Sequence, residues 1–229
     1  QADRLLADLA RLPHALLLAG PVGLGKNVFA WQLARRLLCT QPAADAQPCG
    51  ACHSCRLYQA GNHPDITHIA PAEPGKGILI DQIRALADFL QLKAHSAPSK
   101  VAVIAPAEAM NLNAANALLK MLEEPPAGSY LLLVGTQLQR LPATRRSRCT
   151  RVEFPRPDRR VALDWLHAQG EGGAEAELLL DLADGAPLRP LIDRQHAVVM
   201  EETHKKLYGK RQHARRVGGP DRGTHRNQI

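Results

Sequence analysis

The chain has 229 residues, of which 45% are hydrophobic, so it is long enough for one large domain or two smaller ones with a real core. It has no apolar run of about 18 residues, which excludes a membrane-spanning helix, and no signal peptide is visible, although it begins at Gln1 rather than Met. The net charge of +7 suggests a nucleic-acid partner, but residues 201–229 alone hold eight Lys and Arg against three acids.

Strands and helices alternate along the first two thirds of the chain. We expect strands over Ala15–Ala19, Asp65–Ala70, Lys100–Ala105, Tyr130–Gly135 and Thr150–Phe154. We expect helices over Asn27–Leu38, Ile80–Leu92 and Asn113–Glu124. This order is typical of a parallel sheet whose two faces are covered by helices, so the fold class is α/β.

The strand signal ends at Pro155 and Pro157, which we interpret as a linker. Helical spacing then continues over Val161–His167, Ala174–Leu182 and Leu188–Val199. We therefore expect a nucleotide-binding-like domain over residues 1–156 and a small helical domain over 157–200. Residues 201–229 have almost no apolar side chains after Leu207, so we expect a disordered basic tail, with binding to DNA or another polyanion as the alternative.

A phosphate-binding loop follows the first strand. Its pattern G-x-x-x-x-G-K-[ST] is complete through Lys26, with Gly20 and Gly25 at the two fixed glycine positions and Gly23 between them. The last position should be Ser or Thr, because its hydroxyl coordinates the Mg²⁺ of the nucleotide, but Asn27 stands there. The loop therefore keeps its cradle and its charge and lacks a metal ligand.

The acids of a working ATPase are also missing. Such an enzyme places an Asp, and usually a Glu, after the third strand, and here Ala105 and Pro106 occupy those positions. The nearest acid is Glu108, which we expect to be a surface residue near a helix N-terminus, with a metal role as the alternative. Fast hydrolysis is not expected, whereas the backbone N–H groups of Gly23–Lys26 still favour phosphate, so nucleotide binding stays open.

Four cysteines lie close together in the sequence after the first helix. Cys39 is followed by Cys49, Cys52 and Cys55 in two Cys-x2-Cys steps, and four thiolates suit a closed tetrahedral Zn²⁺ shell. We therefore expect a structural zinc that staples a module over about residues 39–60. The alternatives are reduced, unpaired cysteines or a disulfide, which would need an oxidising compartment.

Three other residues near this chemistry are interpreted differently. His53 and His63 could replace a cysteine as ligands, but four cysteines suffice, and we expect His53 to face solvent. Cys149 is distant in the sequence, and we expect it to be a small buried residue.

Several motifs together resemble one known family. They are the segment Asn116–Pro126 (NALLKMLEEPP), the triplets Ser147-Arg148-Cys149 and His63-Pro64-Asp65, and the four-cysteine insertion after the phosphate-loop helix. Over about Arg11–Ile192 the chain resembles the bacterial clamp-loader ATPases. Its altered loop and missing acids are similar to the delta-prime type of subunit of DNA polymerase III, since the gamma/tau type keeps a Thr after the Lys and an acidic pair.

The resemblance implies an AAA+ fold with a helical lid and assigns roles to single residues. Arg148 would be an arginine finger that reaches ATP held by a neighbouring subunit. Thr136 would be the phosphate-sensing polar residue, with a plain strand-end hydroxyl as the alternative. Leu188 stands where active members carry a second sensing Arg, although Arg189 is adjacent. For Arg148 the alternatives are a solvated basic residue or a contact to DNA phosphates.

The resemblance also implies a function and partners. The chain would be a clamp-loader subunit in a DNA-directed DNA polymerase complex, without ATPase activity of its own, that helps to load the sliding clamp on primed DNA. Its partners would be the gamma/tau and delta subunits, in the bacterial cytoplasm at the nucleoid-associated replisome. The family's collar domain is expected to be missing, because residues 201–229 do not resemble it. The alternatives are an active gamma/tau-type ATPase and a zinc-dependent nucleic-acid-binding module.

Overall fold

A computed structural model gives the structure of the protein and describes residues 9–43, 47–136 and 147–189. The basic tail and most of the helix expected over Leu188–Val199 lie outside these residues. No helix in the described ranges is both long enough and apolar enough to cross a membrane.

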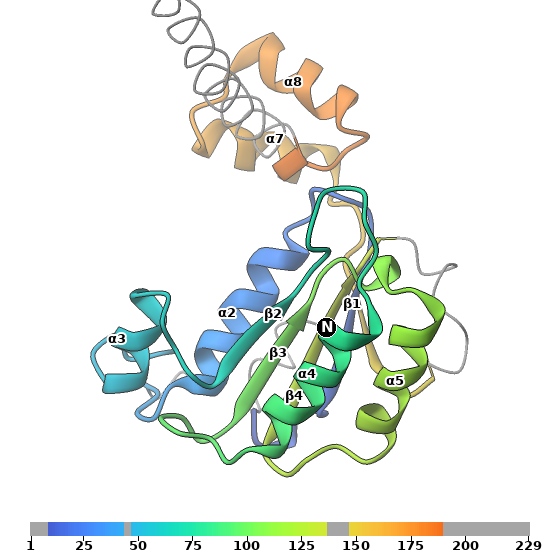
Figure 1. Ribbon diagram of the computed structural model, residues 1–229. Helices are drawn as coiled ribbons and strands as arrows, with labels where there is room; N and C mark the ends of the chain where they lie inside the picture. The colour runs from blue at the N-terminus through green and yellow to red at the C-terminus, as the bar shows by residue number, and fades with distance from the viewer. Residues whose placement is uncertain (1–8, 44–46, 137–146, 190–229) are drawn as a thin grey trace, which may run out of the picture.

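Five parallel strands form one sheet in the order β2-β3-β4-β1-β5 (Figure 1). The strands are β1 (Ala15–Ala19), β2 (Ile66–Ile69), β3 (Lys100–Ile104), β4 (Ser129–Gly135) and β5 (Thr150–Glu153). The three inner strands are apolar along almost their whole length, because a parallel sheet with both faces covered buries every side chain. The expected parallel sheet is therefore confirmed, with each strand within one or two residues of its predicted bounds.

Helices cover both faces of the sheet and create two separate cores. On one face α4 (Ile80–Gln91) and α5 (Leu112–Glu123) pack against the side chains of Leu17, Ala102 and Leu133. On the other face α2 (Lys26–Leu38) packs against Leu16, Val103 and Leu132. Successive strand residues alternate between these two cores, as the pleat of a strand requires.

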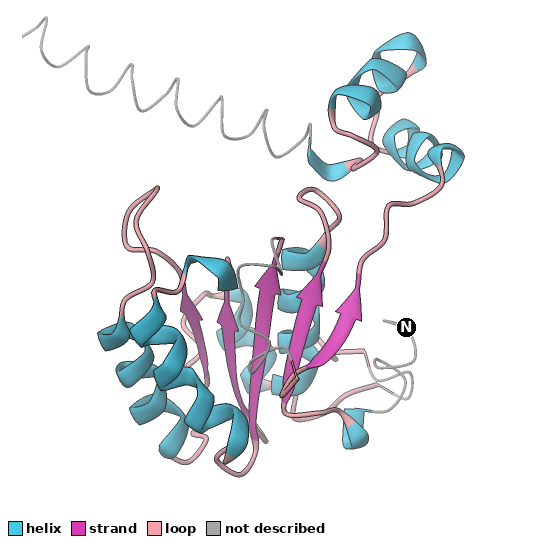
Figure 2. Cartoon of the chain, turned by 90° about the vertical axis from the view of Figure 1, so that its right-hand side faces the viewer, coloured by secondary structure: helices cyan, strands magenta, loops and turns pink. Residues whose placement is uncertain are grey.

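Two further helices, α7 (Arg159–Ala168) and α8 (Gly173–Leu182), follow β5 and pack on each other through a small apolar cluster of their own. All five strand arrows point toward this helical pair, and we call residues 159–189, which include both helices, the lid (Figure 2). The carboxyl ends of the strands, where the phosphate loop begins, therefore face the lid. The AAA+ arrangement of a sheet domain followed by a helical lid is present.

One helix was not predicted from the sequence. It is α3 (His53–Gln59), inside the four-cysteine insertion, a segment with few apolar residues. The Cys52 sulfur caps it by accepting a hydrogen bond from the Cys55 backbone N–H, and hydrophobic spacing gives no signal for such a helix. A short 3-10 helix, η1 (Leu9–Arg11), precedes β1, and another, η2 (Ala107–Ala109), follows β3.

Candidate functional site

The phosphate loop lies where the sequence predicted it, between β1 and α2. Gly20 ends the strand so closely against β5 that a Cβ there would lie 2.4 Å from the Phe154 carbonyl oxygen. Gly25, at φ 77°, precedes the first turn of α2, and Asn27 is exposed on that turn. The glycines thus lead directly into the start of α2, and the N-terminus of a helix is a place where backbone N–H groups favour phosphate.

Lys26, the remaining positive charge of the loop, is buried and folds back on the loop itself. Its Nζ donates a hydrogen bond to the Pro21 carbonyl oxygen. Burial lowers the pKa of Lys26, and the nearby Glu108 carboxylate offsets part of that shift. The ammonium group thus already has partners within the protein.

The lid touches the loop directly. The Leu188 backbone N–H donates to the Gly23 carbonyl oxygen at 3.1 Å. A Cβ on Gly23, which has φ 79°, would lie 2.5 Å from the Arg189 Cβ, so only glycine permits this contact. Leu188, at the position expected of a second sensing Arg, instead places its methyl group over Gly25. An apolar contact therefore stands where active members would present a charge.

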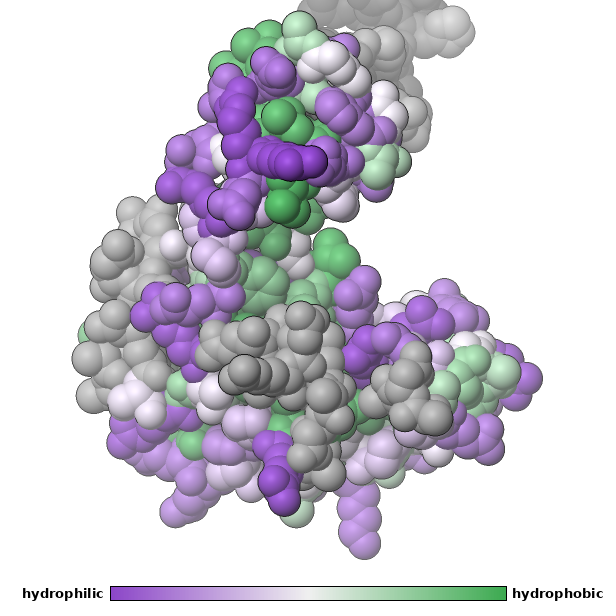
Figure 3. Space-filling view, turned by 180° about the vertical axis from the view of Figure 1, so that it is seen from behind, coloured by the Kyte–Doolittle hydropathy of each residue, from purple (hydrophilic) through white to green (hydrophobic). Residues whose placement is uncertain are grey.

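A cavity of about 620 Å³ lies between the loop, the strand ends and the lid, within the size range of small-ligand sites. Figure 3 shows the lid overhanging the sheet, with a hollow between them. The residues that line it are Val22, Gly23, Gly25, Lys26, Asn27, Val28, Trp31, His68, Ala105, Pro106, Val134, Thr136, Trp165, Gln169 and Leu188. Lys26 is the only Lys or Arg among these lining residues, and none of them is a carboxylate. The nearest acid, Glu108, lies behind Thr136 and bonds to it.

Glu108 lies in the first turn of a helix, as the sequence analysis expected, but it is less exposed than expected. It is half-buried in η2, and its Oε1 accepts hydrogen bonds from the Thr136 backbone N–H at 3.0 Å and from the Thr136 hydroxyl. Its exposure is reduced because η2 packs against β4, which brings the Glu108 carboxylate to Thr136. The Thr136 hydroxyl, the expected phosphate sensor, therefore already binds a carboxylate of its own chain.

Arg148 is exposed and lies just before β5. Its Nη2 is 2.5 Å from Oε1 of Glu123, at the end of α5. Because Leu16 pairs with Thr150 and Ala19 pairs with Glu153, Arg148 precedes the amino end of β5, whereas the phosphate loop follows the carboxyl end of β1. The five residues of β1 span about 17 Å at about 3.3 Å per residue. Arg148 thus lies near the amino ends of the strands, and the loop lies at their carboxyl ends.

The four cysteines of the insertion come together. The Sγ atoms of Cys39, Cys49, Cys52 and Cys55 all lie within 4.8 Å of one another, and Cys39 Sγ is 3.7 Å from Cys49 Sγ. Four thiolates at about 2.3 Å from a central Zn²⁺ would be separated by about 3.8 Å, so the donor set and its spacing fit a tetrahedral metal. Within the described residues, neither His53 nor His63 belongs to this cluster, and His53 is exposed as expected.

The thiols of this cluster are in unequal environments. Burial would raise the pKa of Cys52, but hydrogen bonds from Thr40 and from the Cys55 backbone N–H outweigh it and lower the pKa to about 5. Burial raises the pKa of Cys55 to about 12, so this thiol resists ionisation beside its neighbours. A bound cation would relieve that resistance. Cys149 lies apart in the α4/α5 core, buried as expected.

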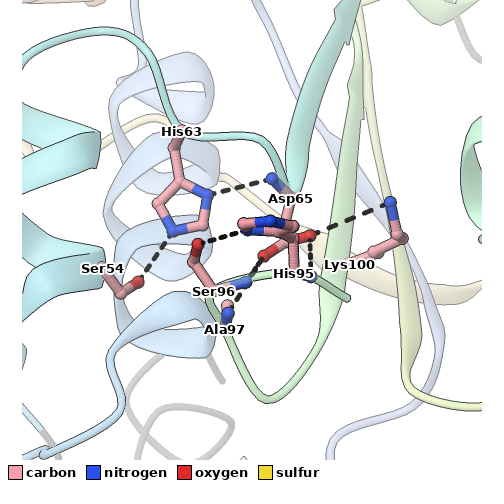
Figure 4. A network of polar contacts seen from close by, with 7 residues as sticks. All are labelled: Ser54, His63, Asp65, His95, Ser96, Ala97 and Lys100. Carbon is pink, nitrogen blue, oxygen red and sulfur yellow. Dashed lines mark hydrogen bonds and ion pairs between the residues drawn. The ribbon is translucent and has the colours of Figure 1, made fainter. Parts of the chain in front are cut away.

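A buried polar network ties the insertion to the sheet (Figure 4). His63 Nδ1 accepts from the Asp65 backbone N–H at 3.0 Å, so Nε2 carries the proton and donates to Ser54 Oγ at 2.8 Å. The Ser54 hydroxyl donates to the Leu38 carbonyl oxygen. Ser54 lies in α3, and Leu38 ends α2 just before Cys39. The chain of bonds therefore fixes the cysteine module on the end of α2 and the start of β2.

Asp65 is the fully buried anion of this network. Its carboxylate accepts three backbone N–H groups, from His95, Ser96 and Ala97, at 2.6–3.0 Å, and lies 3.9 Å from Lys100 Nζ. Burial would raise the pKa of Asp65, but these hydrogen bonds outweigh it and hold the pKa below its ordinary value. The His63-Pro64-Asp65 motif is thus a structural joint.

Comparison with known proteins places this site in a family. A profile of the family described as "DNA polymerase III, delta subunit" matches residues 5–158. "DNA polymerase III subunit delta'" of Pseudomonas aeruginosa is 44% identical over 210 residues, covering 88% of this chain and 64% of that protein. The protein of the same name from Escherichia coli K12 is 39% identical over 176 residues, covering 76% and 52%.

A solved structure shares the fold. The DNA polymerase III gamma subunit-related protein of Thermotoga maritima superposes with a TM-score of 0.58 at 25% identity, covering 79% of this chain and 54% of that one. The chain therefore spans about half to two thirds of the length of the relatives it matches.

The buried carboxylate gives a stability prediction. Replacing Asp65→Asn leaves backbone N–H groups without an anion, and we expect the free energy of unfolding at pH 7 to fall by about 3 kcal/mol, measured by urea denaturation. The exposed Asp88→Asn, on α4, is the control and should change it by less than about 0.5 kcal/mol.

The comparison of wild type with Asp65→Asn also tests the direction of the pKa shift of Asp65. Because the pKa of Asp65 is lowered on folding, its contribution is present above its ordinary pKa near 3.8 and is lost as the pH falls through the lower folded value. The gap between wild type and Asp65→Asn should thus narrow below about pH 4. A gap that widens with acid would contradict this account.

Proposed function

Because this chain belongs to the family of the DNA polymerase III delta subunit, we propose that it acts as a delta-prime-type subunit of a clamp loader. In this role it does not hydrolyse ATP and supplies Arg148 to ATP that a neighbouring subunit holds. The observation that carries the proposal is the separation of two features along the strands. A cavity with no carboxylate in its lining lies at the carboxyl ends, and an exposed arginine lies near the amino ends. An arginine so far from its own loop acts on a nucleotide only in trans.

The phosphate loop is best explained as a retained scaffold that binds ATP or ADP weakly or not at all. Lys26 bonds to Pro21, the Gly23 carbonyl receives the lid, and the Thr136 hydroxyl bonds to Glu108. A nucleotide would have to break these contacts, and it would find no hydroxyl at position 27 and no acid at Ala105 or Pro106 to hold its Mg²⁺. The same features argue against the alternative of an active gamma/tau-type ATPase.

The cysteine cluster holds a structural zinc in this proposal. Four sulfurs close the tetrahedral shell and leave no position for water, so the ion would hold α3 and its flanking turns in place. The partners in the complex would be the gamma/tau and delta subunits, and through them the sliding clamp and primed DNA. One relative, a Salmonella typhimurium protein named "DNA polymerase III subunit tau", is 38% identical over 142 residues.

The finger role predicts a loss of activity in the assembled complex. Arg148→Ala in the complete subunit, reassembled with its partners, should lower DNA-dependent ATP turnover at the adjacent site by about 10²-fold or more. Two controls separate other causes: Arg151→Ala removes a neighbouring exposed arginine, and Glu123→Gln removes the charge of a carboxylate that Arg148 contacts. Unchanged turnover in Arg148→Ala, or an equal loss in Glu123→Gln, would refute the finger role.

The altered loop predicts that the isolated subunit turns over ATP no faster than its Lys26→Ala variant. The reason is that no carboxylate lines the cavity and Asn27 replaces the hydroxyl that holds Mg²⁺ in an active loop. Phosphate release from the purified chain with Mg²⁺ and ATP measures this. Hydrolysis that Lys26→Ala abolishes would favour the active-ATPase alternative.

The cysteine cluster predicts one Zn²⁺ per chain, measured by elemental analysis of protein purified without chelator. Cys52→Ala should lose the metal and destabilise the fold, whereas Cys149→Ala, outside the cluster, should retain it. Replacement by Co²⁺ should give the absorption of a tetrahedral thiolate site. Metal-free protein or a six-coordinate spectrum would contradict the assignment.

A further inference from the structure

A second groove lies beside the cysteine module. It shares Trp31 and His68 with the cavity under the lid but is not lined by the phosphate loop. Its volume is about 410 Å³, and it is bounded by α2, α3 and β2. Ile66, Thr67 and His68, three consecutive residues of β2, all line it. Side chains of consecutive strand residues point to opposite faces, so only the edge of the strand can present all three to one groove.

The edge of β2 offers free backbone hydrogen-bonding groups. β2 is an outer strand of the sheet and pairs only with β3 among the described strands. The Asp65 and Ile69 carbonyl oxygens accept bonds from β3, at 2.9 and 3.0 Å. Because these groups alternate along a strand, the N–H and C=O groups of Ile66 and His68 point away from β3, toward the groove. Such an edge is a template for another strand.

Aromatic side chains wall the groove and are held firmly. Trp31 of α2 packs edge-to-face on His68, with ring centroids 5.4 Å apart. The Tyr58 hydroxyl, from α3, donates to the Trp31 carbonyl oxygen at 2.9 Å. The position of Tyr58 depends on α3, whose N-terminus is formed by the metal-site residues Cys52 and Cys55.

The elements that bound the groove carry more positive than negative charge. Within the described part of residues 27–69 the basic side chains are Arg35, Arg36 and Arg56, and the only acid is Asp65. Asp65 is fully buried and held by three backbone N–H groups and Lys100, so it does not balance the arginines at the surface. Arg35 lies close enough to Tyr58 to act on the charge of that phenol. A negatively charged occupant would therefore be favoured.

We propose that this groove binds an extended acidic segment of a partner protein. The segment adds to the edge of β2, places an aromatic or β-branched side chain between Trp31 and Tyr58, and sets its acids against the arginines. The open strand edge favours a peptide over a nucleic acid, because bases and sugars cannot continue a backbone ladder. Binding requires the metal, since the metal holds α3 and thereby Tyr58.

The test begins with a library of random peptides of about twelve residues, displayed on phage and selected on the full chain loaded with zinc. Selected peptides are synthesised with a fluorescent label, and their affinities are measured by anisotropy. We expect acidic peptides with alternating apolar residues, whose binding disappears when zinc is removed. Enrichment of basic peptides, or none above a selection without protein, overturns the proposal.

Two variants isolate the strand edge. His68→Pro removes the ring and the outward N–H, which Pro tolerates on an edge strand, whereas His68→Ala removes only the ring. We expect His68→Pro to bind the selected peptides about tenfold more weakly than His68→Ala, the effect of one hydrogen bond to the ladder. Equal affinities of the two variants overturn the strand addition.

Two further measurements test the proposal without relying on a substitution in β2, which could itself disturb the fold. In the first, the peptide is methylated at one backbone nitrogen at a time and the protein is unchanged. Methylation should weaken binding about tenfold at the alternate residues whose N–H groups bond to β2, and it should have little effect at the residues between them. A labelled oligothymidylate provides the nucleic-acid arm. If it binds the zinc-loaded chain more tightly than any selected peptide and loses that binding in Tyr58→Ala, the groove is a nucleic-acid site and the proposal fails.

Discussion

The common direction of five strands is the constraint on which this molecule's chemistry depends. In a parallel sheet the carboxyl ends of all strands lie on the same side. The phosphate loop, the Ala105-Pro106 segment and Thr136 therefore meet under the lid. The turn before β5 must lie at the amino ends of the strands, and Arg148 belongs to this turn. One chain therefore separates what a nucleotide needs for binding from the arginine that could act on it.

At the carboxyl ends of the strands, polar groups around the phosphate loop form hydrogen bonds within the protein. Gly23 accepts from the lid, Lys26 donates to Pro21, and Glu108 receives both donors of Thr136. These are the types of group that elsewhere hold phosphate and magnesium. Their internal pairing is consistent with the proposed site, which keeps its shape without performing hydrolysis.

The sequence predicted the strands, the loop and the cysteine cluster because each has a local signal. Buried strands are apolar runs, the loop has fixed glycine spacing, and two Cys-x2-Cys steps place thiols together. It could not predict α3, whose cap is a sulfur in a polar segment, or the bond from Thr136 to Glu108, residues 28 apart. The position of Leu188 over Gly25 also depends on tertiary packing of the lid, which no local pattern encodes.

The most direct test of the central claim is a structure of the assembled complex with a transition-state analogue of ATP hydrolysis bound. The account predicts that the Arg148 guanidinium leaves Glu123 and lies about 3 Å from phosphate oxygens of the nucleotide held by the neighbouring subunit, while the Lys26 loop of this chain holds no such analogue. An analogue bound at Lys26, with Arg148 still paired to Glu123 and distant from any phosphate, would contradict it.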